Sequence, residues 1–138
     1  MMDTKTAQEL VNQAIEAREK AHAPYSKFKV GAAILTKDGT IFPGCNIENA
    51  SYGATICAER TAVANMVSSG HIDPVVIAIC YNETEFALPC GICRQVLSEF
   101  ADPNEDFVVL MAKLDGTYQE TTLSNLLPGA FKLIDSKK

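Results

Sequence analysis

The apolar run Val75–Ile79 constrains the fold of this 138-residue chain more than any other segment. It follows Pro74, and its β-branched residues predict a strand that is buried within a sheet. Helical periodicity precedes the run, ending near Gly70, and helical periodicity follows it from about Gly91 to Phe100. Strands that are linked through helices are expected to lie parallel, joined by right-handed crossovers. The centre of the chain therefore predicts a sheet of the α/β class.

The flanking segments add further helices and strands. Residues 6–21 carry apolar residues at helical spacing, behind a capping box of Thr6 and Glu9. The other predicted strands and the last helix cover residues 28–35, 40–46, 107–111, 118–120 and 123–127. With 47% hydrophobic residues, a chain of this length can bury one core. We expect a single domain over residues 1–138 with three layers, α-β-α, in which helices cover both faces of a mixed five-stranded sheet.

Charge and cysteine content narrow the class of function. A net charge of −5 without a Lys/Arg cluster disfavours nucleic acid as a partner, because phosphate neutralisation needs clustered cations. No apolar stretch has the length of a membrane span, and the N-terminal residues lack an export signal. We therefore expect a cytoplasmic protein that acts on a small molecule. Thiols stay reduced in the cytoplasm, so the five cysteines are expected to be metal ligands or core residues rather than disulfides.

Two short cysteine motifs lie where the two central helices are expected to begin. The first contains Cys57 and Glu59, and the second, which follows Pro89, contains Cys90 and Cys93. A thiolate at a helix N-terminus is stabilised by unpaired N–H groups and by the helix dipole. If the two helices are neighbours, the three thiolates can converge on one Zn²⁺ ion. Three protein ligands leave its fourth position open, which is typical of catalytic zinc.

Glu59 is the candidate catalytic residue. It is too close in sequence to Cys57 to bind the same ion, and it is expected to face the open position, where a carboxylate can accept and relay a proton. A Cys-x-x-Cys pair by itself also fits a redox pair or half of a structural zinc site. Cys57 and Glu59 upstream, together with Pro89, favour the catalytic site and match the signature of zinc nucleobase deaminases. A non-catalytic zinc-binding module is the alternative of a different class, and it would have no need for Glu59.

Other polar and sulfur-containing residues are expected to have structural or supporting roles. Three thiolates around Zn²⁺ carry a formal charge of −1, which a cation should offset. Arg60 is the first candidate for a hydrogen bond to a sulfur and Arg94 the second, whereas an ordinary salt bridge is the plainer role of Arg60. The remaining thiols and the two histidines are expected to be core residues and surface residues, respectively: Cys45, Cys80, His22 and His71.

Nearly the whole chain resembles the small, homotetrameric cytidine deaminases. Five blocks in the family's order carry the resemblance, which is far more specific than any one of them alone. The blocks are Ala23-Pro24-Tyr25-Ser26-Lys27-Phe28 with Val30-Gly31-Ala32-Ala33, Gly44-Cys45-Asn46-Ile47-Glu48-Asn49-Ala50, Cys57-Ala58-Glu59-Arg60-Thr61-Ala62, Pro89-Cys90-Gly91-Ile92-Cys93-Arg94-Gln95-Val96 and Leu126-Leu127-Pro128-Gly129-Ala130-Phe131. The resemblance implies zinc-dependent hydrolysis of cytidine and deoxycytidine to uridine and deoxyuridine plus ammonia, a step of pyrimidine salvage.

The resemblance also implies a role for each matching position. One zinc ion per subunit would be bound by the three cysteines already named, with Glu59 as the proton shuttle. Asn46 and Glu48 would hydrogen-bond the ribose, Phe28 would pack against the pyrimidine, and the backbone N–H of Ala58 would contact the pyrimidine carbonyl oxygen. Two aromatic residues, Tyr52 and Phe131, would reach the active site of a neighbouring subunit, so that the tetramer shares its sites.

Simpler interpretations stay open for the substrate contacts. From the residues alone, Phe28 is a core residue at the end of a strand, Asn46 and Glu48 form a solvated strand rim, and Phe131 covers its own subunit. The chain departs from common family members at residues 53–55 and at Leu88, which bear on the choice of nucleoside. A deaminase of the blasticidin S type, or one acting on a polynucleotide cytosine, is the second enzyme hypothesis.

Overall fold

The computed structural model describes residues 3–133. Among them, the elements follow in the order α1 (Thr4–Arg18), β1 (Gly31–Thr36), β2 (Ile41–Cys45), the 3₁₀ helix η1 (Tyr52–Ala54), α2 (Ala58–Ser68), β3 (Pro74–Cys80), α3 (Gly91–Phe100), β4 (Val108–Ala112), β5 (Tyr118–Thr122) and α4 (Leu123–Leu126). None of the helices within this range has the length and apolar character that a bilayer crossing needs. The short helix η1 is an element that the sequence patterns did not predict.

The five strands form one mixed sheet, as predicted. Their order is β2-β1-β3-β4-β5, with β3 and β4 parallel and the other neighbours antiparallel. Because β2 and β3 are both antiparallel to β1, they run in the same direction. Both strand–helix–strand connections, through α2 and through α3, therefore join strands of equal direction. The run Val75–Ile79 lies in β3, at the centre of the sheet.

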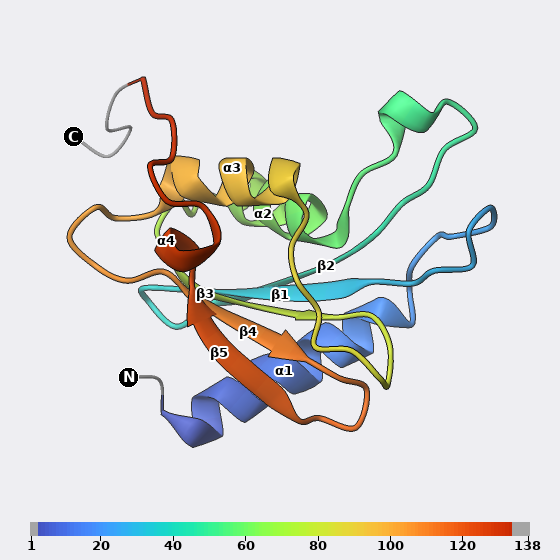
Figure 1. Cartoon of the computed structure of the whole chain (residues 1–138), viewed down its shortest axis with the longest axis horizontal. Helices are drawn as coiled ribbons and strands as arrows, with labels where there is room; N and C mark the ends of the chain where they lie inside the picture. The colour runs from blue at the N-terminus through green and yellow to red at the C-terminus, as the bar shows by residue number, and fades with distance from the viewer. Residues whose placement is uncertain (1–2, 134–138) are drawn as a thin grey trace.

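The helices cover both faces of the sheet, which confirms the three-layer arrangement. Figure 1 shows α1 on one face and α2 with α3 on the other. Consecutive residues of β3 point to opposite faces: Ala78 packs into the core under α1, whereas Ile77 and Ile79 pack under α2 and α3. Side chains of both helix layers are fully buried against the sheet, among them Leu10, Val11, Met66 and Leu97.

Glycine in β2 allows α2 to lie unusually close to the sheet edge. A methyl group placed on the Cα of Gly44 would lie 2.6 Å from the carbonyl oxygen of Ala58, which is closer than carbon and oxygen approach without a clash. Any larger residue would therefore push the first turn of α2 away from β2. Gly44 thus fixes the position of the helix start that carries Cys57 and Glu59.

The predicted starts of two elements were wrong, and helix α1 also ends at Arg18 rather than at residue 21. Helix α1 begins two residues earlier than expected, because the side chain of Asp3 caps it by accepting a hydrogen bond from the Thr6 backbone N–H at 3.1 Å. Strand β1 begins at Gly31 rather than at residue 28. Residues 28–30 do not belong to the strand, because the Asn46 side chain binds the backbone of Phe28 and Val30 instead.

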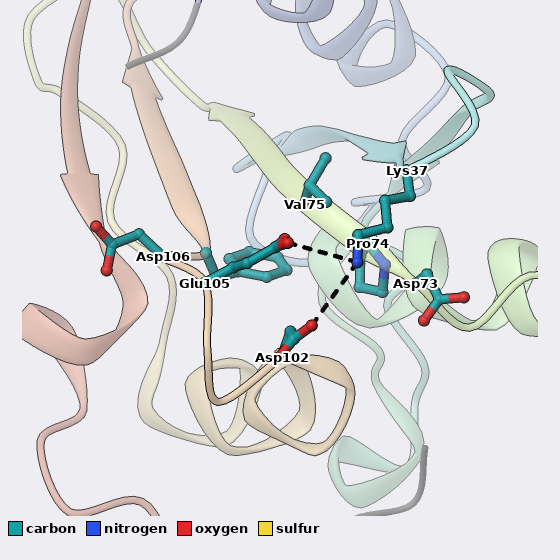
Figure 2. Close-up of a pocket in the computed structure, with 8 residues that line it drawn as sticks. Lys37, Asp73, Pro74, Val75, Asp102, Glu105 and Asp106 are labelled. Atoms are coloured by element: carbon teal, nitrogen blue, oxygen red, sulfur yellow. Dashed lines mark ion pairs between the residues drawn. The ribbon is translucent and has the colours of Figure 1, made fainter. Parts of the chain in front are cut away.

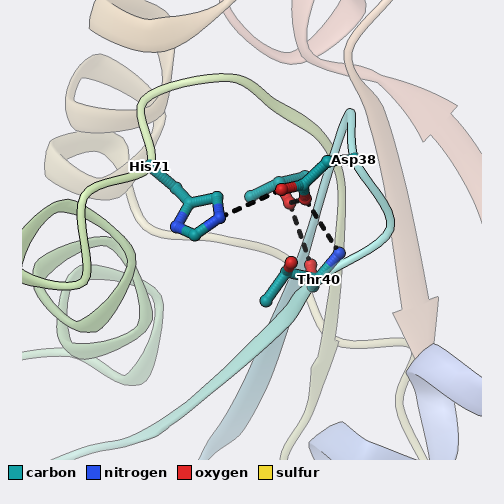
Figure 3. A network of polar contacts seen from close by, with 4 residues as sticks. Asp38, Thr40 and His71 are labelled. Carbon is teal, nitrogen blue, oxygen red and sulfur yellow. Dashed lines mark hydrogen bonds and ion pairs between the residues drawn. The ribbon is translucent and has the colours of Figure 1, made fainter.

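Two polar clusters tie the β1–β2 turn to the rest of the molecule. The ammonium group of Lys37 lies 3.7 Å from Asp102 and 3.6 Å from Glu105 in the loop after α3 (Figure 2). Asp38 accepts hydrogen bonds from the Thr36 hydroxyl and the Thr40 backbone, and it lies 3.1 Å from Nε2 of His71 (Figure 3). Exposed ion pairs such as those of Lys37 contribute only about 0–1 kcal/mol each.

Candidate metal centre

The two cysteine motifs lie at the starts of two adjacent helices, as predicted. Cys57 is the N-cap residue of α2, and Cys90 is the N-cap residue of α3. The Cys90 sulfur accepts a hydrogen bond from the Cys93 backbone N–H at 3.5 Å. The first backbone N–H groups of a helix have no partner within the helix and carry the positive end of its dipole. Both helix starts therefore favour thiolates at the same point.

The three sulfur atoms lie close enough together to bind one metal ion. The Sγ atoms of Cys57 and Cys90 are 3.7 Å apart, those of Cys90 and Cys93 are 3.2 Å apart, and all three lie within 4.8 Å of one another. A tetrahedral Zn²⁺ with sulfur ligands at about 2.3 Å places its sulfurs about 3.8 Å apart. Within residues 3–133, no fourth Cys, His, Asp or Glu joins the cluster. The donor set thus fits a zinc ion with one open position.

The protonation of the cluster shows how strongly its sulfurs interact. A hydrogen bond from the Cys93 thiol, with further help from Arg60 and Cys90, lowers the pKa of Cys57 to about 5. The same hydrogen bond, together with burial, raises the pKa of Cys93. The two shifts have opposite directions, so Cys57 is favoured as a thiolate and Cys93 as a thiol. A metal cation in this place would favour the thiolate form of every ligand.

Glu59 lies in the first turn of α2 and is only 4% exposed. Burial raises the pKa of its carboxyl group, and the negative charge of Cys57 acts in the same direction, while contacts with Cys93 and Cys90 oppose it. The carboxyl group therefore lies beside the three sulfurs without joining them as a ligand. A carboxyl group with a raised pKa holds a proton more readily than an exposed one, which suits a group that accepts and returns a proton.

Of the two candidate cations, only Arg60 contacts a sulfur. Its Nη2 atom lies 3.7 Å from the Cys57 sulfur and 3.3 Å from the carbonyl oxygen of Thr55. The hydrogen bond to Cys57 raises the pKa of Arg60, so the guanidinium stays charged. Arg94 instead donates at 2.9 Å to the carbonyl oxygens of Pro89 and Leu126, and so connects the second cysteine motif to the end of α4.

Three predicted substrate contacts lie together at the end of β2. The Asn46 side chain is buried, and it donates to the Phe28 carbonyl oxygen and accepts from the Val30 N–H, each at 2.8 Å. Glu48 accepts hydrogen bonds from the backbone N–H groups of Tyr25 and Ser26 and lines a cavity of about 420 Å³. Phe28 is 46% exposed and its ring lies 5.1 Å from that of Tyr81, so it is not a core residue.

Of the remaining predicted site residues, one is buried and two are exposed. Ala58 is fully buried as the first residue of α2. Tyr52 lies in η1, beside the cavity that Glu48 lines, and is 83% exposed. Phe131 is 67% exposed, and its carbonyl oxygen accepts a hydrogen bond from Gln95 at 3.0 Å. Figure 1 shows the segment with η1 extending away from the sheet.

The cysteines and histidines outside the motifs do not approach the metal cluster. Cys80 is buried in β3, and burial raises its pKa to about 11, while burial of the half-exposed Cys45 also raises its pKa. His22 is exposed, as predicted. His71 is not a free surface residue, because it pairs with Asp38 and its ring lies 5.0 Å from that of Phe42. No local sequence pattern indicates this contact, because it joins residues far apart in the chain.

Comparison with known proteins places this site in a family. Residues 4–111 match the family model described as the cytidine and deoxycytidylate deaminase zinc-binding region. A cytidine deaminase of Halalkalibacterium halodurans is 51% identical over 93% of this chain and 96% of its own length. A cytidine deaminase of Sporosarcina psychrophila is 47% identical over 93% of each chain. The crystal structure of the cytidine deaminase from Burkholderia pseudomallei has a TM-score of 0.83 and 43% identity, covering 94% of this chain and all of that one.

Proposed function

The chain belongs to the cytidine and deoxycytidylate deaminase family and is a hydrolytic deaminase, and we propose that it converts cytidine and deoxycytidine to uridine and deoxyuridine with release of ammonia. One observation carries this proposal. Three cysteine sulfur atoms converge beside the buried carboxyl group of Glu59, which is not part of the metal cluster. A site that only held the fold together would gain nothing from burying Glu59 there, because burial of a carboxylate costs free energy.

We propose that Cys57, Cys90 and Cys93 bind one Zn²⁺ per subunit. When bound, zinc lowers the pKa of a coordinated water to roughly 7. Arg60 donates to the Cys57 sulfur and so offsets part of the negative charge of three thiolates. Cys90 is exposed whereas Cys93 is buried, so one side of the cluster faces solvent and can admit a substrate.

Glu59 moves the protons in the proposed reaction. It takes a proton from the attacking water and delivers it to ring N3, which makes C4 electrophilic. The water oxygen then forms a bond to C4, and Glu59 transfers the second proton to the amine as the C4–N bond breaks. The products are the uracil nucleoside and ammonia. The raised pKa of Glu59 suits this role, because a group that exchanges protons works best near the operating pH.

The residues around Glu59 would orient the nucleoside. The Ala58 N–H, as the first of α2, has no acceptor within the helix and can donate to the pyrimidine carbonyl oxygen. We assign the half-exposed ring of Phe28 to the pyrimidine, and the side chains of Asn46 and Glu48 to the ribose. An enzyme acting on a polynucleotide would need cations for the phosphates, whereas a carboxylate beside the cavity suits a free sugar hydroxyl.

Zinc analysis combined with a spectrophotometric assay tests the substrate assignment. The purified protein is expected to contain about one zinc per chain and to reduce the ultraviolet absorbance of cytidine and deoxycytidine as ammonia is released. Cytosine in a short single-stranded DNA and blasticidin S serve as alternative substrates in the same assay. Turnover of either one in preference to cytidine would overturn the nucleoside assignment.

A homotetramer with shared sites is the proposed assembly. It would cover the exposed rings of Tyr52 and Phe131 by placing them at a neighbouring subunit's site. We expect a solution mass four times that of the 14.9-kDa chain. Glu59→Gln and Phe131→Ala proteins, each impaired alone, should regain up to about a quarter of full activity when they are mixed into hybrid tetramers. A fully active monomer, or hybrids without any gain, would contradict shared sites.

The remaining assignments follow from the same proposal. We place the reaction in pyrimidine salvage and the protein in the cytoplasm, where free nucleosides would be its substrates. Residues 1–138 are proposed to form a single domain. Both cores lie against one continuous sheet, which supports this assignment.

A further inference from the structure

The loop before β1 is held in an unusual backbone conformation. Lys27 has a φ of 62°, in the left-handed region that residues other than glycine rarely adopt. Its backbone N–H donates to the Ala23 carbonyl oxygen at 3.0 Å, which closes a turn directly before Phe28. A residue in this region is strained, and it stays there only because the surrounding contacts compensate the strain. The contacts that hold this turn therefore also place the Phe28 ring.

Glu48 holds one side of the turn. Its Oε1 atom accepts from the backbone N–H groups of Tyr25 and Ser26, at 3.0 and 3.1 Å. Its Oε2 atom accepts a hydrogen bond from the Ser26 hydroxyl, and this bond is the largest of the causes that lower the pKa of Glu48. Glu48 is thus kept as a carboxylate in one orientation, although it lies at the surface.

Ser26 connects this carboxylate to Phe28. While its hydroxyl donates to Glu48, it accepts a hydrogen bond from the Phe28 backbone N–H at 2.9 Å. A hydroxyl group has one donor and two acceptor positions, so it can make both bonds at once. On the far side of Phe28, the carbonyl oxygen is bound by Asn46 at 2.8 Å. Both peptide groups of Phe28 are therefore fixed by polar side chains, and Ser26 makes the only direct side-chain link between Glu48 and Phe28 among the hydrogen bonds described.

We propose that Ser26 is a positioning residue that fixes the sugar-binding carboxylate of Glu48 and the ring of Phe28 in a single arrangement relative to each other. This inference rests on the proposed function, in which Glu48 contacts the ribose and Phe28 the pyrimidine. The described hydrogen bonds of Ser26 join it to Glu48 and Phe28, and none of them reaches the metal cluster or Glu59. It therefore governs how tightly the nucleoside is bound and leaves the proton transfers at the metal cluster unchanged.

Steady-state kinetics of Ser26→Ala with cytidine test this role. We expect KM to rise at least about tenfold, the effect of losing one hydrogen bond to a charged group, while kcat changes by less than about twofold. Ser26→Thr, which keeps the hydroxyl, should restore KM to within about threefold of the original value. Ser69→Ala, at an exposed serine after α2, is the matched control and should leave both constants unchanged. Zinc content should be equal in all four proteins.

The outcomes separate this inference from the proposed function. Absence of cytidine turnover by the unmodified protein would overturn the proposed function and this role with it. Normal turnover with a KM for Ser26→Ala equal to that of Ser69→Ala would overturn the role of Ser26 alone. A fall in kcat at unchanged KM would do the same, because it would place the effect at the chemical step. If Ser26→Ala does not fold, Ser26→Cys keeps the size and only a weak donor, and the same rise in KM is expected.

Discussion

Replacing Glu59 with glutamine is expected to reduce kcat for cytidine by about 10²-fold to 10⁴-fold while zinc stays bound. Glutamine has the shape of glutamate but cannot accept and return a proton at neutral pH. Glu59 is 4% exposed and lies beside the sulfur cluster without belonging to it, so its replacement removes proton transfer and leaves the three ligands in place. Single-turnover and steady-state assays, with zinc measured on the same samples, check both parts of this expectation.

The control for this variant is Glu9→Gln, at an exposed position of α1 on the opposite face of the sheet. It makes the same chemical change at a distance from the site and should retain full activity. Turnover of Glu59→Gln within about tenfold of the unmodified enzyme would remove Glu59 from the mechanism. Loss of zinc from Glu59→Gln would instead assign the carboxylate to metal binding.

The metal centre was predictable because its parts are local in sequence. Cys57 and Cys90 each precede a segment with helical periodicity, and a helix start can be located from such a pattern within a few residues. That the two starts meet follows from the parallel direction of the helix-linked strands, which the apolar run in β3 indicates. What sequence could not supply was the separation of the sulfurs, since this depends on Gly44 and on the close approach of α2 to β2.

The errors share a different cause, namely side chains that bind backbone groups. Thr6 and Glu9 form a competing capping pattern three residues after Asp3, so the sequence pattern does not identify Asp3 as the cap. Phe28 and Val30 were predicted as strand residues because their apolar spacing fits a strand. Their backbone groups are bound instead by Asn46, which is distant in the chain, and no local pattern reports such a contact.

The largest expected effect on stability follows from replacing Cys57 with alanine. This change removes one of three ligands and the acceptor of the Arg60 hydrogen bond, and it leaves Cys93 buried without its main partner. Binding of a metal ion by the protein's own ligands contributes directly to folding stability. We expect the variant to be purified without zinc, to have no measurable deaminase activity and to melt about 10 °C below the unmodified protein.

Cys45→Ala provides the matched control, because Cys45 is a half-buried thiol in β2 outside the metal cluster. This variant should keep its zinc and its activity. Treating the unmodified protein with a strong chelator should give a melting temperature close to that of Cys57→Ala, since both lack the ion. If Cys57→Ala keeps a full complement of zinc and its activity, the three sulfurs are not the metal site. If the chelated protein stays as stable as the zinc-bound one, the metal serves the reaction and the hydrophobic cores alone hold the fold.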